Sequence, residues 1–267
     1  DWPAPANVRA LITTRAGGAS QGPYPSFNLV LRTDDDPRAV SANRAQLEAL
    51  MPQPPRWLRQ VHGATVVEAD SLADAPDADA SVARYAGTVC GVLVADCIPV
   101  LFSDRAGTTV AVAHAGWRGL AAGVIPNAVE RMGIAPRNLV AYLGPGIGPA
   151  AFEVGADVRD VFLSRDAGLQ AAFAPHAPGK WLADLFLLAR QSLQRAGVED
   201  IHGGGLCTYS DARRFSSPDR LQDSHSLSMA SRMANTRRGF TPQSSRLSPS
   251  GGTDTSRMLE EVSGRTP

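Results

Sequence analysis

The sequence predicts an α+β fold, a single domain built from mixed β-sheets. Strand-like apolar runs and helix-like stretches alternate irregularly along the chain, and the runs IPVLF and VAVA flank a polar turn in the manner of a hairpin. A doubly wound parallel sheet would instead require regular alternation of strand and helix. With 267 residues and 43% hydrophobic content, the chain is long enough to bury one substantial core.

The expected elements follow one another from the N-terminus. A strand-and-turn region extends to about Leu31, and an amphipathic helix over residues 37–50 places Val40, Leu47 and Leu50 on one side. The strands that carry the candidate metal ligands come next. Further helices are expected near residues 120–131, 151–163 and 182–196.

Three residues with metal-binding side chains stand at the ends of separate strand-like runs: His62 in QVHG, Cys97 in ADC and His114 in HAGWRG. Imidazole nitrogen and thiolate sulfur both suit zinc, and three protein ligands leave a fourth position for water or substrate, as in catalytic zinc sites. No CxxC or HxxxH pair supplies a fourth ligand nearby. The pattern therefore predicts an enzymatic site in which these three residues are both metal ligands and catalytic groups.

The segment between Cys97 and His114 predicts how these two ligands meet. A hairpin turn centred on Arg105 and Ala106 would place Cys97 directly opposite His114. Opposed residues have Cβ atoms about 4.5–5.5 Å apart, within reach of one metal ion. Pro99 argues against a regular ladder here, because it lacks an N–H group and often marks a sheet edge or a bulge.

A structural role is the alternative for each of these candidates. Free cysteines are commonly small buried hydrophobes, and isolated histidines often lie in the core or on the surface. Cys90 fits that description because it lies inside the apolar run TVCGVLVA, and Cys207 lies in the strand-like LCTYS. Cys97 differs because Asp96 precedes it and the apolar run ends there, where strand ends meet loops and sites form.

The composition gives no indication of a nucleic-acid or membrane partner. The formal net charge is zero, so no bulk electrostatic attraction to polyanions is expected. The chain has three cysteines and lacks an apolar run long enough for a membrane span or a signal-peptide core, which favours a reducing, cytoplasmic location. The oligomeric state is left open.

Ordered motifs cover residues 10 to about 215: TTRAGGAS, GPYPSFNL, VSANRAQL, QVHGATVV, ADCIPVLF, VAVAHAGWRGLAAGV, YLGPGIGPAAFEVG, DLFLLARQSL and GGGLCTYSDARRF. Together they resemble the laccase-domain family, also called the polyphenol oxidase or YfiH-like purine nucleoside phosphorylase family. HAGWRG beside ADC is the most specific part of the resemblance.

The resemblance implies a four-layer α/β/β/α sandwich and a zinc site at His62, Cys97 and His114. It implies phosphorolysis of adenosine, inosine and methylthioadenosine, with some adenosine deamination, while the older family name implies copper-dependent oxidation of phenols. Zinc is therefore the expected cofactor, with copper as the alternative, and purine nucleosides and phosphate are the expected partners. Multicopper chemistry usually needs many histidines, and this chain has five.

Three residues are candidates for substrate contacts. Arg118, four residues after His114, and Arg15 in TTRAGG each offer a guanidinium whose planar fork suits phosphate. Surface charge is their alternative role, and it is a stronger alternative for Arg15 than for Arg118, which lies beside the proposed metal ligand His114. Gln60, two residues before His62, would point to the same side of an extended segment, where it suits either purine recognition or support of the ligand.

The C-terminal segment departs from the family pattern. Relatives are expected to continue with a tyrosine-and-arginine segment, a TGR motif and a closing apolar strand, but residues 216–267 contain twelve serines and only six Leu, Ile, Val or Phe. That composition predicts disorder. We therefore expect a laccase-like nucleoside phosphorylase domain over residues 1–215 and an atypical, disordered tail over residues 216–267. A reading-frame shift near codon 216 explains the change most economically, and a genuine interaction tail is the alternative.

The altered tail adds a third interpretation of the function. The candidate ligands survive, but loss of a closing strand would expose a sheet edge and remove any substrate-binding arginine that the strand carries. A zinc-binding module with weakened or lost catalysis therefore stands beside the phosphorylase and the copper oxidase.

Overall fold

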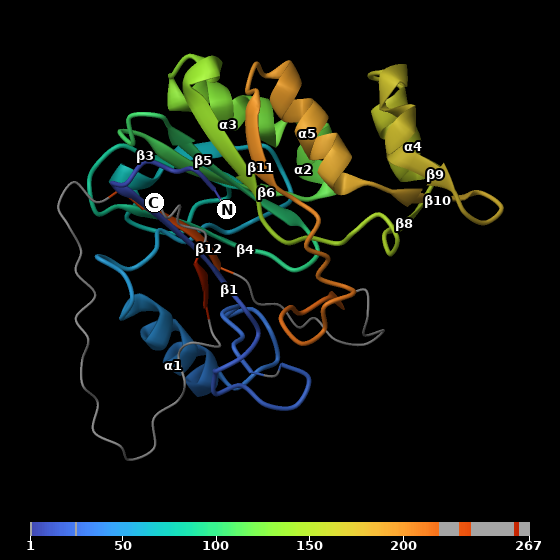
Figure 1. The fold of residues 1–267 in the computed structure, drawn as a ribbon. Helices are drawn as coiled ribbons and strands as arrows, with labels where there is room; N and C mark the ends of the chain where they lie inside the picture. Colours follow the sequence, from blue (N-terminus) through green and yellow to red (C-terminus); the bar gives the residue numbers. More distant parts are fainter. Residues whose placement is uncertain (1, 25, 219–229, 236–258, 262–267) are drawn as a thin grey trace.

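The computed structural model describes residues 2–24, 26–218, 230–235 and 259–261, the last two ranges as backbone only. Within them the chain forms one mixed α/β domain with a six-stranded, a four-stranded and a three-stranded sheet (Figure 1). The expectation of a single domain with mixed sheets is confirmed, and its four-layer α/β/β/α order stays a prediction.

The six-stranded sheet carries the candidate site. Its strands follow the order β11 (Asp200–Gly203), β7 (Leu139–Leu143), β5 (Ile98–Asp104), β6 (Val110–Ala115), β3 (Ala80–Ala83) and β2 (Val66–Glu68). The two outer pairs, β11 with β7 and β2 with β3, are parallel, while the inner neighbours are antiparallel. The central pair is the predicted hairpin of β5 and β6.

The other two sheets are antiparallel. The four-stranded sheet has the order β13 (Leu259–Glu261), β1 (Val8–Thr13), β12 (Ala230–Asn235) and β4 (Val89–Leu93). The small sheet, with the order β8 (Glu153–Gly155), β10 (Lys180–Ala183) and β9 (Phe173–Pro175), extends to one side of the molecule beside α4 (Ala156–Leu163) (Figure 1).

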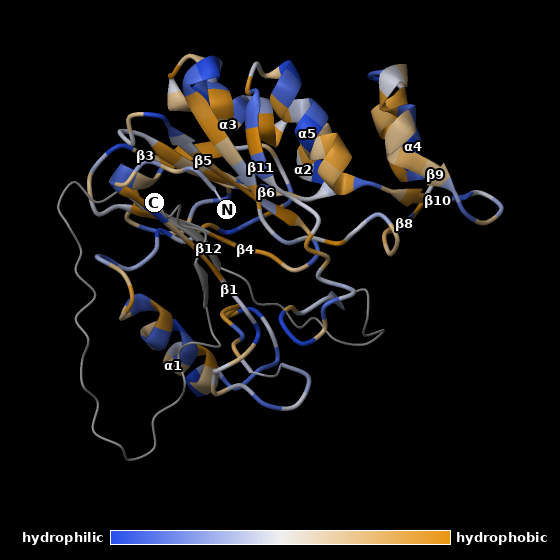
Figure 2. Cartoon of the chain, viewed as in Figure 1, coloured by the Kyte–Doolittle hydropathy of each residue, from blue (hydrophilic) through white to orange (hydrophobic). Residues whose placement is uncertain are grey.

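Helices cover the two larger sheets from opposite sides. In Figure 1, α2 (Trp117–Ala122), α3 (Val124–Met132) and α5 (Leu185–Arg195) lie together above the six-stranded sheet. Below, α1 (Pro37–Glu48) packs through Leu47 against Val89 of β4. Figure 2 shows both apolar and hydrophilic residues on α3 and α5, as expected for helices with one buried face.

The observed helices are shorter than the sequence predicts. The helix expected over residues 120–131 is divided between α2 and α3, because Gly123 adopts a left-handed φ of +92° between them. The helix expected from residue 151 begins at Ala156, since the preceding residues form β8. The helix expected from residue 182 begins at Leu185, where the carboxylate of Asp184 caps it by accepting from the N–H of Leu187 at 2.9 Å.

β5 is buried on both faces, so its successive side chains join two different cores. Val100 and Phe102 pack in the core beneath α2, α3 and α5, whereas Leu101 packs in the core that the six-stranded sheet shares with β1 and β4. Fully burying side chains of this size contributes roughly 1.5–3 kcal/mol each. Polar side chains are therefore concentrated where the central strands end.

The tail prediction falls mostly outside the described residues. Ser216 and Ser217 are buried, and β12 pairs with β1 and β4 while β13 pairs with β1. Disorder of the remaining tail and its origin in a reading-frame shift stay predictions.

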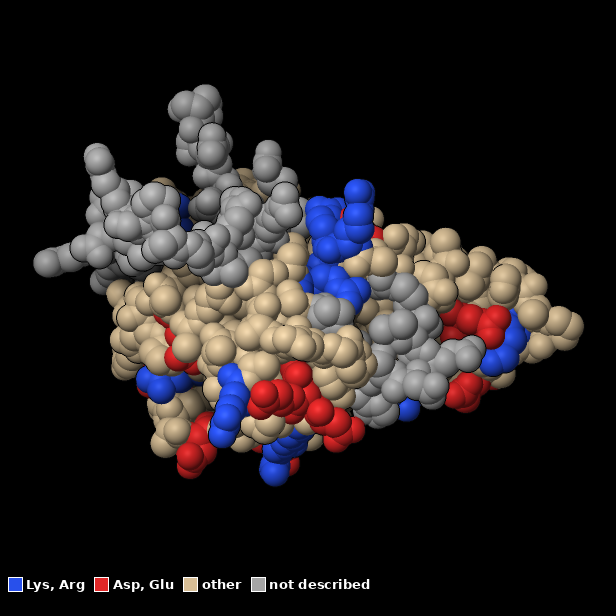
Figure 3. Space-filling view, turned by 90° about the horizontal axis from the view of Figure 1, so that it is seen from below, with Lys and Arg blue, Asp and Glu red and all other residues tan. Residues whose placement is uncertain are grey.

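None of the helices in the described ranges is both long and apolar enough to cross a bilayer. On the face in Figure 3, acidic and basic side chains lie in small separate groups among neutral residues.

Asn43 ties α1 to the N-terminal loop. On the helix face predicted from Val40 and Leu47, Asn43 is also fully buried. Its Oδ1 accepts from the N–H of Ala19 at 2.7 Å, and its Nδ2 donates to the carbonyl of Asn28 at 2.8 Å. The loop that follows Asn28 therefore has a fixed position against α1.

Replacing Asn43 by Ala should destabilise the protein by about 2–3 kcal/mol, because buried backbone groups lose their partners. Urea unfolding measures the change. Ser41→Ala on the exposed side of the same helix is the matched control, with an expected change within about 0.5 kcal/mol. Equal stability of the two variants would contradict the assigned role of Asn43.

Candidate metal centre

Three metal-binding side chains from different parts of the chain meet at one end of the six-stranded sheet. His62 lies in the loop before β2, Cys97 immediately precedes β5, and His114 lies near the end of β6. Their candidate ligand atoms all lie within 4.8 Å of one another. The imidazole rings of His62 and His114 stand edge to face, with centroids 4.8 Å apart. The fold thus brings the predicted ligand residues together.

The hairpin of β5 and β6 is present, but its predicted register is wrong by two residues. Pro99, rather than Cys97, lies opposite His114. The turn is shifted because the carboxylate of Asp104 accepts from two backbone N–H groups across it, at 2.6 and 2.7 Å. A shift of two residues preserves the face of the sheet, so Cys97 still reaches His114 from the adjoining loop.

Pro99 does not mark a sheet edge, contrary to the expectation. β5 lies between β7 and β6, and Pro99 is its second residue. The pairing of β5 with β7 begins only at Val100, and the Pro99 carbonyl accepts from the N–H of Gly144 at 2.9 Å. The missing N–H therefore falls at a strand start, where a ladder hydrogen bond is not required.

Asp79 connects two of the candidate ligands, and the sequence prediction missed it. Its fully buried Oδ1 lies 2.8 Å from Nδ1 of His114 and accepts from the N–H of His62 at 2.9 Å. Its Oδ2 accepts from the N–H of Gly63 at 2.7 Å. Burial alone would raise the pKa of Asp79, but the hydrogen bonds from His114 and from the backbone hold it below its usual value. An ionised Asp79 leaves Nε2 of His114 facing Cys97.

The thiol of Cys97 and the ring of His114 shift one another's proton affinity. Burial alone would raise the pKa of Cys97, but the charge of His114 and hydrogen bonds to both histidines lower it to about 7. Burial alone would lower the pKa of His114, yet the Cys97 thiolate and Asp79 raise it to about 9. The thiolate form needed for metal binding is therefore accessible near neutral pH.

Gly116 leaves the space that the Cys97 sulfur occupies. A Cβ atom at position 116 would lie 2.6 Å from Sγ of Cys97 and 3.5 Å from the ring of His62. Gly116 stands directly before α2, two residues after His114. The glycine of the HAGWRG motif thus has a steric role in the site.

The donor set fits a single metal ion of the zinc type. It consists of one thiol and two imidazoles, all soft or borderline ligands, and a buried carboxylate orients one imidazole. His62 is the most exposed of the three and His114 the most buried, so the cluster is open on the side of His62. Three protein ligands with an open side are typical of catalytic centres.

The open side faces a cavity of about 350 Å³. Beside the three ligands, the cavity is lined by Val30, Leu31, Arg32, Arg44, Trp57, Leu58, Arg59, Gln60, Ala75, Leu93, Val94 and Ala95. Its volume is within the range of small-molecule pockets.

The predicted substrate-binding residues lie in different surroundings. Gln60 lines the cavity, but its amide exchanges two hydrogen bonds with the backbone of Leu93, at 2.7 and 2.8 Å, which favours the supporting role. Arg118 is exposed and stacks over Trp117, outside the cavity lining. Arg15 also lies outside that lining and donates to the carbonyl of Ala212 at 3.1 Å. The substrate roles of these residues stay predictions.

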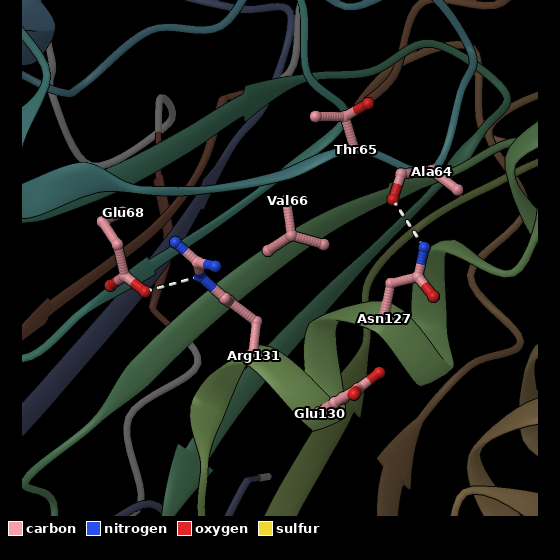
Figure 4. Close-up of a pocket in the computed structure, with 7 residues that line it drawn as sticks. All are labelled: Ala64, Thr65, Val66, Glu68, Asn127, Glu130 and Arg131. Atoms are coloured by element: carbon pink, nitrogen blue, oxygen red, sulfur yellow. Dashed lines mark hydrogen bonds and ion pairs between the residues drawn. The ribbon is translucent and has the colours of Figure 1, made fainter.

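A second hollow of about 780 Å³ lies between β2 and α3 (Figure 4). Its polar side chains already bind neighbours: Arg131 donates to Glu68 at 2.6 Å, and Asn127 donates to the carbonyl of Ala64 at 2.9 Å. None of the three candidate ligands lines it. The smaller cavity is therefore the better candidate for chemistry.

Fold and site together define a mixed α/β protein with a His, Cys, His centre at a pocket. The chain matches the family described as multi-copper polyphenol oxidoreductase laccase over residues 9–232. The chain belongs to this family.

Relatives with a curated name include a Pseudomonas aeruginosa protein called purine nucleoside phosphorylase, which is 54% identical over 216 residues, 80% of this chain and 89% of the relative. Purine nucleoside phosphorylase YfiH of Escherichia coli is 50% identical over 217 residues, with the same shares of 80% and 89%.

Solved structures of similar proteins share the fold. A Neisseria meningitidis protein matches with a TM-score of 0.85 and 48% identity over 88% of this chain and 97% of that chain. YlmD from Geobacillus stearothermophilus matches with a TM-score of 0.77 and 29% identity over 86% of this chain and 93% of that chain.

Replacing Gly116 by Ala should weaken zinc binding about tenfold or more, because the added methyl group would displace the Cys97 sulfur. Competition with a chromogenic chelator measures the affinity. Gly179→Ala is the control. Gly179 has a left-handed φ of +72°, so an added methyl group strains the backbone there, but the residue lies outside the cavity lining. The control should lose stability and keep its zinc affinity; equal affinity in both variants would refute the steric role.

In chelator-treated protein, alkylation of Cys97 by iodoacetamide should accelerate as the pH rises through about 7, because the thiolate is the reactive form. His114→Ala should move this midpoint upward, toward the ordinary thiol value. Cys90 should stay unmodified, since burial raises its pKa to about 12. Mass spectrometry of peptides separates the three cysteines, and an unchanged midpoint in His114→Ala would contradict the coupling.

Proposed function

We propose that this chain is a zinc-dependent purine nucleoside phosphorylase that acts on adenosine, inosine and methylthioadenosine with phosphate. The observation that carries the proposal is a cavity in which one thiol and two imidazoles converge. Its support is identity of 54% and 50% to proteins named purine nucleoside phosphorylase.

Phosphorolysis exchanges one bond at the sugar for another. A phosphate oxygen bonds to the anomeric carbon of the ribose while the bond from that carbon to the purine nitrogen breaks. The electron pair of the broken bond moves to the purine, which takes up a proton and leaves as the free base. Holding both reactants in one cavity supplies much of the acceleration for such a step.

The residues of the chain bind the reactants and exclude water. The side chains of Leu58 and Val94 are almost fully buried and offer an apolar wall to the purine. His62, Cys97 and His114 would hold zinc, which supplies a Lewis acid and a bound water of lowered pKa. Asp79 keeps Nε2 of His114 directed at the cluster.

Deamination of adenosine is a second activity that we propose for the same cavity. In that reaction a water oxygen replaces the amino group on the purine ring, and ammonia leaves. The step needs a hydroxide-like nucleophile at neutral pH, and a zinc ion held by His62, Cys97 and His114 would supply one by lowering the pKa of water.

Copper-dependent phenol oxidation is the alternative that the family description favours. In the described ranges one group of three His and Cys ligands is found, which fits one metal ion more readily than several. A zinc-binding module with impaired catalysis is the other alternative, on account of the sequence after residue 215. The assay below separates all three.

Purified protein should contain about one zinc per chain and release adenine from adenosine only when phosphate is present. Cys97→Ala should lose both properties, because the cluster loses its thiolate. Cys207→Ala is the matched control, since that thiol lies outside the cluster, bound to the N–H of Gly148 at 3.2 Å. Elemental mass spectrometry and chromatography of the purine products provide the measurements.

The outcomes assign the function. Inosine formed from adenosine without phosphate marks the deaminase activity, because deamination leaves the bond between the ribose and the base intact. Copper content with phenol oxidation would replace the phosphorylase proposal by the oxidase. Zinc without turnover of any nucleoside would indicate the impaired module.

A further inference from the structure

We propose that Arg32 and Arg44 form a phosphate-binding subsite beside the three candidate ligands. Both residues line the cavity that contains His62, Cys97 and His114. The inference rests on the proposed phosphorylase function, and it names the part of that site which holds the phosphate ion.

Two contacts hold Arg44 in the cavity wall. Its Nε donates to the carbonyl of Leu29 at 2.8 Å, and its guanidinium carbon lies 4.6 Å from the centre of the Trp57 ring. The hydrogen bond from Nε uses one edge of the guanidinium, and the contact with Trp57 uses one face. The two terminal nitrogens remain as a fork that can donate to an anion. A guanidinium fixed in this way loses little freedom when it binds an anion.

Arg44 forms no ion pair among the residues that the structure describes, although the charge of Glu48 acts on it from the same helix. The side chain is half-buried, and burial lowers its pKa while the charge of Glu48 raises it. No described carboxylate oxygen lies within the 4.0 Å of an ion pair with it. Because burial disfavours this cation and no described carboxylate contacts it directly, an anion in the cavity would stabilise it.

Arg32 enters the same cavity from a loop that Asn28 holds in place. The Asn28 amide donates to Thr33 Oγ1 at 3.0 Å and to Asp35 Oδ2 at 2.9 Å, and it accepts from the N–H of Val30 at 3.0 Å. Arg32 itself is exposed and, in the described ranges, forms no ion pair. The backbone of this loop is held in place while the guanidinium of Arg32 is in solvent. The Arg32 side chain is therefore suited to turn onto a ligand in the cavity.

Arg59 provides the contrast within the same cavity. It forms an ion pair with Asp77, so its charge is already compensated. Arg32 and Arg44 are therefore the cations of the described cavity lining that form no ion pair. Two guanidinium groups match a phosphate ion, which accepts hydrogen bonds through several oxygens, whereas a purine nucleoside carries no charge to match them.

The first test measures binding of inorganic phosphate, in zinc-loaded and in chelator-treated protein. Phosphate should raise the unfolding temperature of the wild type in a saturable way. Arg44→Gln and Arg32→Gln should each weaken the apparent phosphate affinity about tenfold or more. The control is Arg137→Gln, an exposed change beside the start of β7 at the opposite end of the sheet from Cys97, which should keep wild-type affinity.

Phosphorolysis provides the second readout. The two variants should raise KM for phosphate and leave KM for adenosine unchanged. If the wild type is active and both variants keep its KM for phosphate, the subsite is wrong while the proposed function stands. If the wild type releases no base, the phosphorylase proposal fails, and phosphate binding that is lost in both variants still supports the subsite.

Adenosine 5′-monophosphate distinguishes a free phosphate ion from the phosphoryl group of a nucleotide. Stabilisation by this nucleotide without stabilisation by inorganic phosphate would overturn the assignment to the co-substrate. Arg44→Gln also loses packing on Trp57, so circular dichroism checks its fold. The exposed Arg32→Gln tests the subsite independently if the other variant unfolds.

Discussion

The carboxylate of Asp79 is the contact on which the candidate metal centre depends. It accepts from the ring of His114 and from backbone N–H groups of Val61, His62 and Gly63, so one buried group positions a strand end and a loop together. The N–H of His114 in turn donates to the carbonyl of Asp79 at 2.7 Å. Moving either histidine would leave a buried carboxylate with fewer partners, which costs several kcal/mol in comparable sites.

The position of the centre follows from burial of the central strands on both faces. β5 and β6 are apolar along nearly their whole length, and their side chains alternate between two cores. Such strands accept titratable groups mainly at their ends, where loops supply hydrogen bonds. Cys97, His114 and Asp79 all stand at such ends, next to a turn in which Gly116 leaves room for the sulfur.

The sequence was sufficient to predict the three candidate ligand residues, which the fold brings together, and the hairpin, because both depend on residue type and on local alternation. The register depended on how the side chain of Asp104 closes the turn, which the apolar pattern does not encode. Asp79 acquires its role only when β3 pairs with β6, although its place directly before the run ASVA was a usable signal. Arg44 lies on the predicted helix, but only tertiary packing against Trp57 puts it in the cavity wall.

Late segments of the chain determine where the thiol lies. Asp96, beside Cys97, has a left-handed φ of +70°, a conformation that non-glycine residues adopt only when their surroundings enforce it. Here its carbonyl accepts from the N–H of Ile147 at 2.8 Å, while its carboxylate accepts from the hydroxyls of Thr208 and Ser217, the latter at 2.8 Å. Ser217 lies beyond the predicted domain boundary at residue 215, so the residues on which the thiol depends continue into the altered segment. Because contacts from residue 61 to residue 217 position the three candidate ligands, metal binding at this centre would be thermodynamically coupled to folding of the domain.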